Sequence, residues 1–236
     1  MITHLGVIIP AHNEEDEILG CLDSVLQSFA HVPEASVPGG FQIVVVVDAC
    51  TDATLGLVLE FARHCRLAKV LTTSSNSVGS ARDVGCSYFM RSVGGVSGAD
   101  FDTAWVAFTD ADSRVPLHWI SSHLEVAAEG VDCLVGTVAP RPESGSAELI
   151  AKWHANHELG ENHSYVFGAN LGLRGSCLAA IGGVPRLTCG EDAAIVAAVR
   201  TVGGQLRRTD SCRVLTSARL TGRTQGGFSG YLQQLA

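Results

Sequence analysis

The chain has 236 residues, of which 46% are hydrophobic and 17% are charged, so it can bury a sizeable core and intrinsic disorder is not expected. The 16 basic and 24 acidic side chains give a formal net charge of −8, which argues against a general nucleic-acid binder, because such proteins present a basic surface. This length fits one α/β domain, or two small lobes that share a core.

The charge is unevenly distributed along the chain. Beyond residue 199 there are six arginines and a single acidic residue, Asp210, whereas acidic residues dominate the rest of the chain. A basic end on an acidic protein suggests local contact with an anion, such as a phosphate or the headgroups of an anionic membrane. We therefore expect either a phosphate-bearing ligand or a peripheral membrane contact at this end.

Two features indicate where the protein resides. No apolar run approaches the roughly 20 residues that a membrane-spanning helix requires, and the first residues lack the charged leader of a secretory signal. The eight cysteines are scattered without a Cys-x-x-Cys pair, which favours buried free thiols over disulfides or zinc ligands. The sequence thus predicts a soluble, cytoplasmic protein.

Short apolar runs alternate with amphipathic stretches in the first half of the chain, a pattern typical of a mostly parallel sheet flanked by helices. The predicted strands are Leu5–Ile9, Ile43–Val47, Lys69–Leu71 and Trp105–Phe108. The predicted helices are one that Asn13 caps, with an acidic first turn, one that ends near Cys65, one over Val78–Met90 and one that begins at Pro116.

The second half of the chain is less regular. We expect a strand over Cys133–Val135, a helix over residues 144–163, a short helix over Ser176–Ile181, a helix over Glu191–Val202, and strands at 205–208 and 213–216. A soft boundary between the two halves is placed near residue 113.

Asp110 and Asp112 directly follow the predicted strand that ends at Phe108. Residues i and i+2 of an extended chain point to the same face, and two carboxylates about 4 Å apart repel by ~4 kcal/mol if the effective dielectric constant is near 20. A divalent cation removes this repulsion, and Mg²⁺ or Mn²⁺ prefers oxygen ligands together with the phosphates of a substrate. The alternative is a solvated acidic loop, but ligand crevices of open α/β sheets lie at the carboxyl ends of strands.

Other polar residues follow predicted strands or open predicted helices. Asp48 can accept hydrogen bonds from a nucleobase or a ribose, whereas Asp52 is better explained as a helix cap. Arg82 lies in a helix entry of small residues, Gly79–Gly85, which can approach a phosphate closely, although a surface arginine explains this pattern as well.

Glu191 and Asp192 open a predicted helix. They either complement the helix dipole or supply a general base that takes a proton from an acceptor hydroxyl. His154, His157 and His163 lack the i, i+4 spacing of a zinc-binding helix, so we expect them to be exposed or to line an acceptor site.

Five of these segments, in this order, resemble the motifs of the family-2 glycosyltransferases, which are nucleotide-sugar-dependent enzymes of the GT-A fold. The segments are Val7–Glu15, similar to the family's opening strand and nucleoside turn; Val46–Asp52, similar to D-D-G-S-T-D; Gly79–Gly85, similar to G-x-A-R-N-x-G; Asp110–Asp112, the metal motif; and Gly190–Asp192, the acidic acceptor-side motif. Val47, Ala49, Cys50 and Asp83 depart from the family pattern. The resemblance implies one α/β domain over residues 1–236, Rossmann-like, with a nucleotide-binding half over about 1–112 and an acceptor half over about 113–236.

The resemblance also implies a role for each matching residue. The implied nucleotide-sugar ligands are Pro10, Ala11, Asn13, Glu14, Asp48, Arg82, Asp110 and, from a segment like the one that contacts the donor sugar, Asn170. Asp112 would bind a divalent cation, Mn²⁺ or Mg²⁺, and Asp110 would touch the ribose or the metal shell. Asp192 would be the catalytic base, with Glu191 as its rival.

The tail of the sequence resembles the segment that closes over the donor in this family. Arg219 and Arg223 would balance the charge of the leaving diphosphate, unless they are solvated surface arginines. Related enzymes often place a histidine here as a third metal ligand, but no histidine follows His163. The processive members' Q-x-x-R-W motif and membrane helices are not seen in the sequence, so it resembles the soluble, single-addition branch.

The sequence therefore leads to the hypothesis of a hexosyl-type glycosyltransferase (EC 2.4 class) that moves a sugar from a nucleotide-diphosphate sugar to an acceptor hydroxyl. A UDP-sugar is the favoured donor and a GDP-sugar the second choice, and inversion at the anomeric carbon is implied by the resemblance alone. A sugar nucleotidyltransferase is one alternative, although its basic, glycine-rich phosphate loop is replaced here by an acidic turn after Pro10. A non-catalytic sugar-nucleotide-binding protein is the other, which the departures at Val47, Ala49 and Asp83 keep open.

Overall fold

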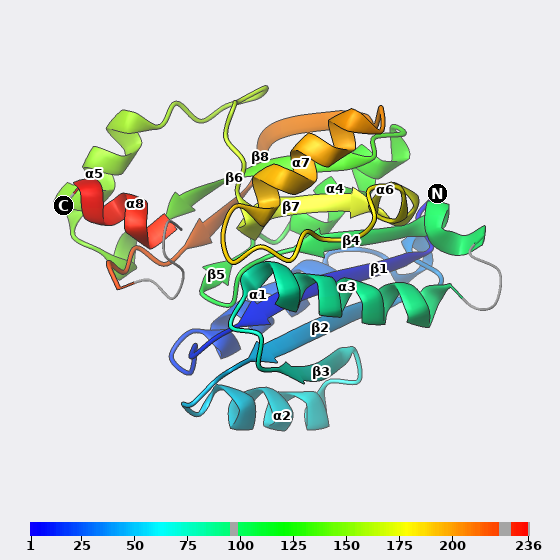
Figure 1. The fold of residues 1–236 in the computed structure, drawn as a ribbon, viewed down its shortest axis with the longest axis horizontal. Helices are drawn as coiled ribbons and strands as arrows, with labels where there is room; N and C mark the ends of the chain where they lie inside the picture. The colour runs from blue at the N-terminus through cyan, green and yellow to red at the C-terminus, as the bar shows by residue number, and fades with distance from the viewer. Residues whose placement is uncertain (95–98, 222–227, 236) are drawn as a thin grey trace.

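In the computed structural model, which describes residues 1–94, 99–221 and 228–235, eight strands form one mixed sheet flanked by helices (Figure 1). The strands are β1 (His4–Ala11), β2 (Phe41–Asp48), β3 (Ala68–Thr73), β4 (Ala104–Phe108), β5 (Ser113–Arg114), β6 (Cys133–Pro140), β7 (Leu171–Arg174) and β8 (Leu206–Thr216). Their spatial order is β3-β2-β1-β4-β7-β6-β8-β5. The first four are parallel, β7 is antiparallel to both β4 and β6, and β8 is parallel to β6. The predicted α/β class with a mostly parallel sheet is confirmed.

Helices cover both faces of this sheet. They are α1 (Ile18–Ala30), α2 (Thr54–His64), α3 (Val78–Val93), α4 (Trp119–Ala128), α5 (Ala147–Asn156), α6 (Gly175–Ala180), α7 (Glu191–Thr201) and α8 (Phe228–Leu235). Helices α1, α2 and α4 pack on one face, and α3, α6 and α7 on the other. The continuous apolar run of β2 follows from this arrangement, because Val45 and Val47 enter one core while Val44 and Val46 enter the other.

Helices α5 and α8 lie side by side at one end of the molecule, where they form a third apolar cluster around the buried Trp153 (Figure 1). Short 3₁₀ turns complete the described elements at Glu34–Ser36, Ala99–Thr103, Pro142–Ser144 and Gly168–Asn170. None of the helices within the described residues is long and apolar enough to cross a membrane.

The start of α1 differs from the prediction, which placed an acidic first turn directly after Asn13. Asn13 has a φ of 55°, and its side-chain Oδ1 accepts the N–H of Thr51 at 2.7 Å. The carboxylate of Glu15 similarly accepts the N–H of Ala53 at 2.8 Å. These polar groups therefore join the turn after β1 to the turn after β2, and α1 begins only at Ile18.

The second half also departs from the prediction in two places. The helix expected over residues 144–163 covers only Ala147–Asn156, and a loop follows it. The strands expected at 205–208 and 213–216 are one strand, β8, whose register with β6 is irregular near Gly136. Glu161 fixes the loop to this irregularity, because its carboxylate accepts the N–H of Asp210 and the hydroxyl of Thr209 at 2.9 Å each.

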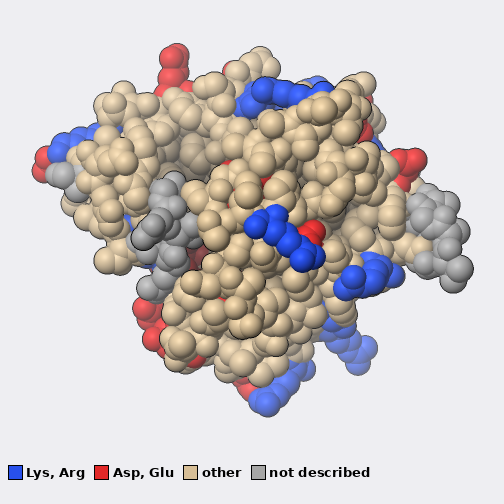
Figure 2. Space-filling view, in the orientation of Figure 1, with Lys and Arg blue, Asp and Glu red and all other residues tan. Residues whose placement is uncertain are grey.

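The basic end of the chain is largely engaged with the protein's own groups. Arg207, Arg213 and Arg219 form ion pairs with acidic side chains, and Arg208 donates to two main-chain carbonyls. On the face shown in Figure 2, the basic side chains lie at separate places rather than in one patch. The expected contact of this end with an anion stays a prediction.

The eight cysteines are all free. Five are buried, namely Cys21, Cys86, Cys133, Cys177 and Cys212. Cys189 is exposed, because it lies in the loop that precedes α7.

Candidate active site

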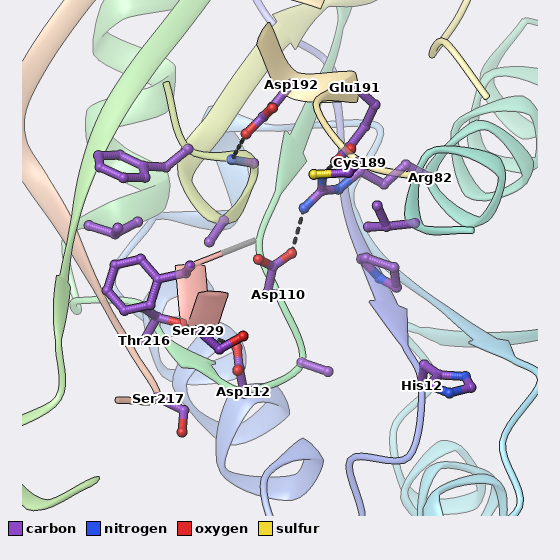
Figure 3. A pocket seen from close by; sticks show the side chains of 18 of the residues that line it. His12, Arg82, Asp110, Asp112, Cys189, Glu191, Asp192, Thr216, Ser217 and Ser229 are labelled. Atoms are coloured by element: carbon purple, nitrogen blue, oxygen red, sulfur yellow. Dashed lines mark hydrogen bonds and ion pairs between the residues drawn. The ribbon is translucent and has the colours of Figure 1, made fainter. Parts of the chain in front are cut away.

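A cavity of about 860 Å³ opens at the carboxyl ends of β1, β2 and β4 (Figure 3). One side is made by the residues that follow these strands, including Glu14, Asp110 and Asp112. The opposite side is made by the first turn of α7 and by Gly168, and the end of β8 and α8 complete the wall. Ligand crevices of open α/β sheets occupy this edge.

Asp110 and Asp112 both line the cavity, but they contact different partners. Asp110 forms an ion pair with Arg82. Asp112 lies 3.1 Å from Nη2 of Arg219, and its Oδ1 accepts the hydroxyl of Thr216 at 3.2 Å. Figure 3 shows the two carboxylates one above the other, with Asp110 nearer to Arg82.

The surroundings of Asp112 are short of positive charge. Burial raises the pKa of Asp112 to about 7; Arg219 opposes this shift, whereas the carboxylates of Asp110 and Glu14 add to it. A buried carboxylate that keeps its proton near neutral pH is one that a cation would stabilise. Carboxylate and hydroxyl oxygens are the donors that Mg²⁺ and Mn²⁺ prefer, so these residues fit a divalent cation. Within the described ranges, no group of three or more His, Cys, Asp or Glu side chains is arranged to hold a metal.

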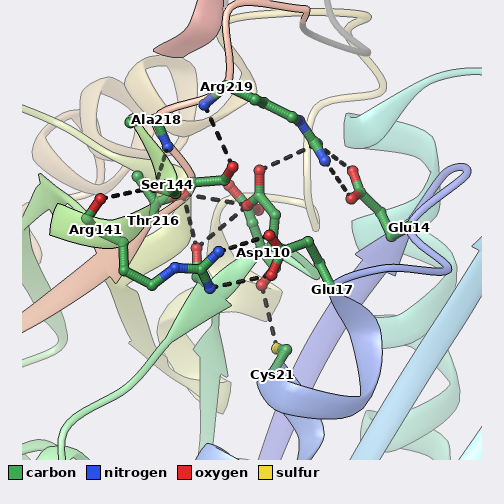
Figure 4. A network of polar contacts seen from close by, with 12 residues as sticks. Glu14, Glu17, Cys21, Asp110, Arg141, Ser144, Thr216, Ala218 and Arg219 are labelled. Atoms are coloured by element: carbon green, nitrogen blue, oxygen red, sulfur yellow. Dashed lines mark hydrogen bonds and ion pairs between the residues drawn. The ribbon is translucent and has the colours of Figure 1, made fainter. Parts of the chain in front are cut away.

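A network of arginines and glutamates surrounds this side of the cavity (Figure 4). Arg219 forms a two-point ion pair with Glu14, and Glu17 accepts hydrogen bonds from Arg141 at 2.6 and 3.0 Å. The main chain at Ala218 donates to the hydroxyl of Ser144 at 2.8 Å. These contacts fix the segment after β8 against the turn after β1. The pairing of Glu17 with Arg141 was not predicted, since no local pattern reveals a partner more than a hundred residues away.

The carboxylate of Asp48, which the sequence suggested as a ligand of the nucleobase or ribose, is engaged by the protein's own groups. It lines the cavity but is only 4% exposed. Its carboxylate accepts the hydroxyl of Thr73 and the main-chain N–H groups of Ser75 (2.7 Å), Asn76 (3.2 Å) and Ser77 (2.9 Å). Although burial opposes it, these hydrogen bonds lower the pKa of Asp48. The carboxylate thus holds the segment between β3 and α3, and it has little capacity left for a nucleobase.

Most, but not all, of the residues expected to form a nucleoside pocket line the cavity. Pro10, Ala11 and Glu14 line the cavity. Asn13 is not among its lining residues, because its side chain turns toward Thr51. His12, which was not predicted, does line the cavity, and its Nδ1 lies 2.7 Å from the carbonyl oxygen of Asp48.

Arg82 reaches the cavity from α3, but its terminal nitrogens are engaged by carboxylates. One donates to Asp110 and the other to Glu191 (Figure 3). Arg82 is 2% exposed and Glu191 4% exposed, so this is a buried pair. Burial raises the pKa of Glu191, and Arg82 opposes that shift.

Asp192 lies beside Glu191 but points elsewhere. Gly190 has a φ of 79°, a left-handed conformation that glycine adopts readily, and α7 starts directly after it. The carboxylate of Asp192 accepts the N–H of Gly168 at 2.9 Å through one oxygen and the N–H of Ala193 at 2.7 Å through the other. Asp192 lines the cavity and is partly exposed, as a group that meets a substrate must be.

Asn170 does not contact the cavity, contrary to the expectation that it meets the donor sugar. It is 0% exposed, and its Oδ1 accepts the indole N–H of Trp119 at 2.9 Å. Its Nδ2 donates to the carbonyl oxygens of Thr137 and Cys212. Asn170 therefore joins α4, β6 and β8 inside the core. Arg223, the other expected contact of the diphosphate, lies outside the described residues.

Aromatic side chains from α5, from the loop that follows it and from α8 line one part of the cavity. These are Trp153, His157, Phe167, Phe228 and Tyr231. The rings of Trp153 and His157 are stacked, with centroids 4.1 Å apart. The histidines were expected to be exposed or to line an acceptor site, and of these His157 lines the cavity.

The chain resembles known glycosyltransferases in sequence and in fold. The family model described as "Glycosyl transferase family 2" matches residues 6–174. Among curated proteins, none is significantly similar in sequence.

Three solved structures illustrate the similarity of fold. TarS of S. aureus (residues 1–349, in complex with UDP) is 18% identical, with a TM-score of 0.65 over 92% of this chain and 61% of that chain. The mannosyltransferase PcManGT from Pyrobaculum calidifontis, in complex with GDP-Man and Mn²⁺, is 18% identical, with a TM-score of 0.66 over 93% and 58%. GalNAc-T7 with UDP, GalNAc and Mn²⁺ is 15% identical, with a TM-score of 0.66 over 96% and 45%. The chain thus spans less than two thirds of each, and the shared architecture confirms the predicted GT-A fold.

Proposed function

The chain belongs to glycosyl transferase family 2, and on this premise we propose that it transfers a sugar from a nucleotide-diphosphate sugar to the hydroxyl group of an acceptor. The observation that carries the proposal is that Asp110, Asp112 and Asp192 line one cavity from opposite sides. Such a transfer needs positive charge near the leaving diphosphate and a base near the incoming hydroxyl. Asp110 and Asp112 would hold the cation that supplies the positive charge, and Asp192, on the other side, would supply the base.

The donor is proposed to bind along the edge formed by β1, β2 and β4. The nucleoside would rest on Pro10 and Ala11, while Arg219 would lie beside the diphosphate. A UDP-sugar is favoured and a GDP-sugar is the second choice, and a hexose is the sugar proposed for transfer. Structures of similar fold that hold UDP or GDP-Man support this choice.

A divalent cation, Mn²⁺ or Mg²⁺, is proposed to bind to Asp112, with Asp110 and the hydroxyl of Thr216 as neighbouring oxygen donors. When bound, the ion would supply Lewis-acid stabilisation of the departing diphosphate. The raised pKa of Asp112, whose side chain is partly buried, supports a site that needs positive charge. Arg219, 3.1 Å from Asp112, adds a fixed positive charge on the same side.

Asp192 is proposed as the base that accepts the proton of the acceptor hydroxyl. The N–H of Gly168 orients its carboxylate, and its partial exposure leaves it accessible from the cavity. Glu191 is less suited to this role because it is buried against Arg82. A base opposite the leaving group would give inversion at the anomeric carbon, and proton NMR of the fresh product measures this outcome.

The acceptor is assigned to the side of the cavity formed by the second half of the chain, about residues 113–236, and the nucleotide to about residues 1–112.

The eight free cysteines support a location in the reducing cytosol.

The decisive experiment combines nucleotide binding with turnover. Calorimetry with UDP or GDP in the presence of Mn²⁺ should detect binding, and hydrolysis of UDP-glucose, UDP-N-acetylglucosamine or GDP-mannose should proceed slowly without an acceptor. Asp192→Asn should bind nucleotide as the wild type does, while its hydrolysis rate falls by about 10²–10⁴-fold.

Asp16→Asn, at an exposed position on the turn before α1, is the matched control and should change neither quantity. A wild-type rate for Asp192→Asn would rule out the base assignment. Binding without any hydrolysis by the wild type would favour a non-catalytic sugar-nucleotide-binding protein.

A further inference from the structure

The guanidinium group of Arg82 lies between carboxylates from the two sides of the cavity. Nη2 donates to Asp110, which follows β4, and Nη1 donates to Glu191, the first residue of α7 (Figure 3). Asp110 belongs to the proposed cation site, and Glu191 is the immediate neighbour of the proposed base, Asp192. A single buried side chain on α3 therefore connects Asp110 with Glu191, which are 81 positions apart in the sequence.

Arg82 also packs against the peptide that orients Asp192. A Cβ atom at Gly168 would lie only 2.4 Å from Nη1 of Arg82, so the guanidinium group lies directly against this glycine backbone. The N–H of the same residue donates to Oδ2 of Asp192 at 2.9 Å. The position of Arg82 consequently limits the position of the group that holds the base.

The burial of this arrangement makes its members depend on one another. Arg82 is 2% exposed and Glu191 4% exposed, so solvent compensates poorly for a carboxylate that is lost at position 191. If Glu191 is lost, Arg82 keeps Asp110 as a partner, but its Nη1 loses its acceptor, so the guanidinium group must find another acceptor or reorient. A change at Glu191 should therefore reach Asp110 through Arg82.

We infer that Arg82 is a positioning residue that fixes the cation-binding side of the cavity relative to the proton-accepting side, and that Glu191 is its anchor rather than the base. This inference rests on the proposed function, because it assigns roles within that reaction. It differs from the expectation that Arg82 contacts the nucleotide, since its terminal nitrogens are already bound by carboxylates.

The first test compares Glu191→Gln with Glu191→Ala in the hydrolysis of UDP-glucose or GDP-mannose with Mn²⁺. Glutamine keeps an oxygen that accepts a hydrogen bond from Nη1 of Arg82, whereas alanine does not. An anchor predicts a kcat within about 10-fold of wild type for Glu191→Gln and about 10²-fold lower for Glu191→Ala. Equally low kcat values for both variants would assign the base to Glu191 and overturn the inference.

The second test asks whether a change at Glu191 alters the binding of UDP on the other side of the cavity, as measured by calorimetry with UDP and Mn²⁺. Glu191→Ala should weaken UDP binding by about 3- to 10-fold, because Asp110 loses its fixed partner, and Glu191→Gln should bind nearly as the wild type does. Neither a base nor a purely local structural residue at position 191 predicts this difference. Unchanged UDP affinity in Glu191→Ala would overturn the coupling.

The third test uses the unfolding equilibrium and needs no turnover. In a double-mutant cycle of Arg82→Met and Glu191→Leu, the pair should be coupled by at least about 10-fold in the unfolding equilibrium constant. Arg174→Met, which breaks a pair with Asp132 away from the cavity, is the control: it should lower stability and leave UDP affinity and kcat unchanged.

The outcomes separate this inference from the proposed function. A wild type that neither binds UDP or GDP nor hydrolyses a donor would overturn the proposed function, and the role of Arg82 with it. A functional wild type with an additive cycle, or with equally inactive Glu191 variants, would overturn only the role of Arg82 and Glu191.

Discussion

Both carboxylate oxygens of Asp48 are occupied by the segment between β3 and α3. Three main-chain N–H groups and two hydroxyls converge on this one side chain, which lies at the carboxyl end of β2. Asn76, with a φ of 48°, belongs to the same segment. The carboxylate thus stabilises a tight bend that brings the first turn of α3, and with it Arg82, to the cavity.

Asp48→Ala should lower the free energy of unfolding by ~1–3 kcal/mol, because buried N–H donors lose their acceptor. Urea denaturation measures this loss, and the exposed Asp16→Ala should show almost none. A stability equal to wild type would mean that the segment is held by other contacts. UDP affinity should fall as well, since the segment lines the cavity.

At this scale, residue types and spacing predicted which acids lie at the sheet edge but not what each one contacts. Asp110, Asp112, Glu191 and Asp192 all line the cavity, as the motifs indicated. Asn13 and Asn170 are instead bound by groups of other segments, and the carboxylate of Asp48, which also lines the cavity, is bound by main-chain N–H groups. A short polar side chain at the end of a strand or in a turn suits a ligand and a turn equally, and only the folded chain distinguishes the two.

Helix α8 is held mainly by one apolar face. Leu232 is 0% exposed and packs with Leu149, Trp153 and Ala218, which come from α5 and from the segment after β8. The same cluster supports the aromatic wall of the cavity, so the docking of α8 and the shape of the acceptor side depend on the same contacts.

Leu232→Ala should weaken the docking of α8 by ~2–4 kcal/mol, since it removes buried methyl groups and leaves a cavity. Trp153 would then meet water, so the tryptophan emission should shift to longer wavelength, while Trp105 and Trp119 stay in the main core. Gln234→Ala, on the exposed side of α8, should leave the spectrum unchanged. An unshifted spectrum for Leu232→Ala would argue against a role of this residue in covering Trp153.

Elements were predictable where one residue pattern extends over a whole element. The alternation of apolar runs and amphipathic stretches located β1, β2, β4 and α3 closely, because buried strands and one-sided helices require those patterns. The start of α1 was misplaced because contacts between distant turns decide it. No strand was predicted at β7, since its four residues are too few to show a period.

The stability of the whole molecule should depend on pH through His123. This side chain is 0% exposed, and its Nδ1 accepts the indole N–H of Trp105 at 3.0 Å. Burial lowers the pKa of His123 to about 3, so it stays neutral in the folded state while the unfolded chain binds a proton below about pH 6.5. Stability is therefore retained above that pH and is lost as the pH falls.

At pH 5 this single group should cost ~2 kcal/mol relative to pH 7. His123→Asn does not titrate and keeps an oxygen for the indole of Trp105, so its stability should fall less between pH 7 and pH 5, as urea denaturation at several pH values would measure. His31→Asn, at an exposed position, should keep the wild-type slope. Parallel slopes for wild type and His123→Asn would contradict the assignment.

Strand β7 joins the two halves of the sheet, because it pairs with β4 on one side and with β6 on the other. When the chain leaves the ribosome, β4 has one open edge until residues 171–174 emerge. An open edge of an apolar strand pairs readily with other chains. During synthesis the nascent first half is therefore a natural client for a chaperone, and a fragment cut near residue 113 should self-associate rather than fold as an independent module.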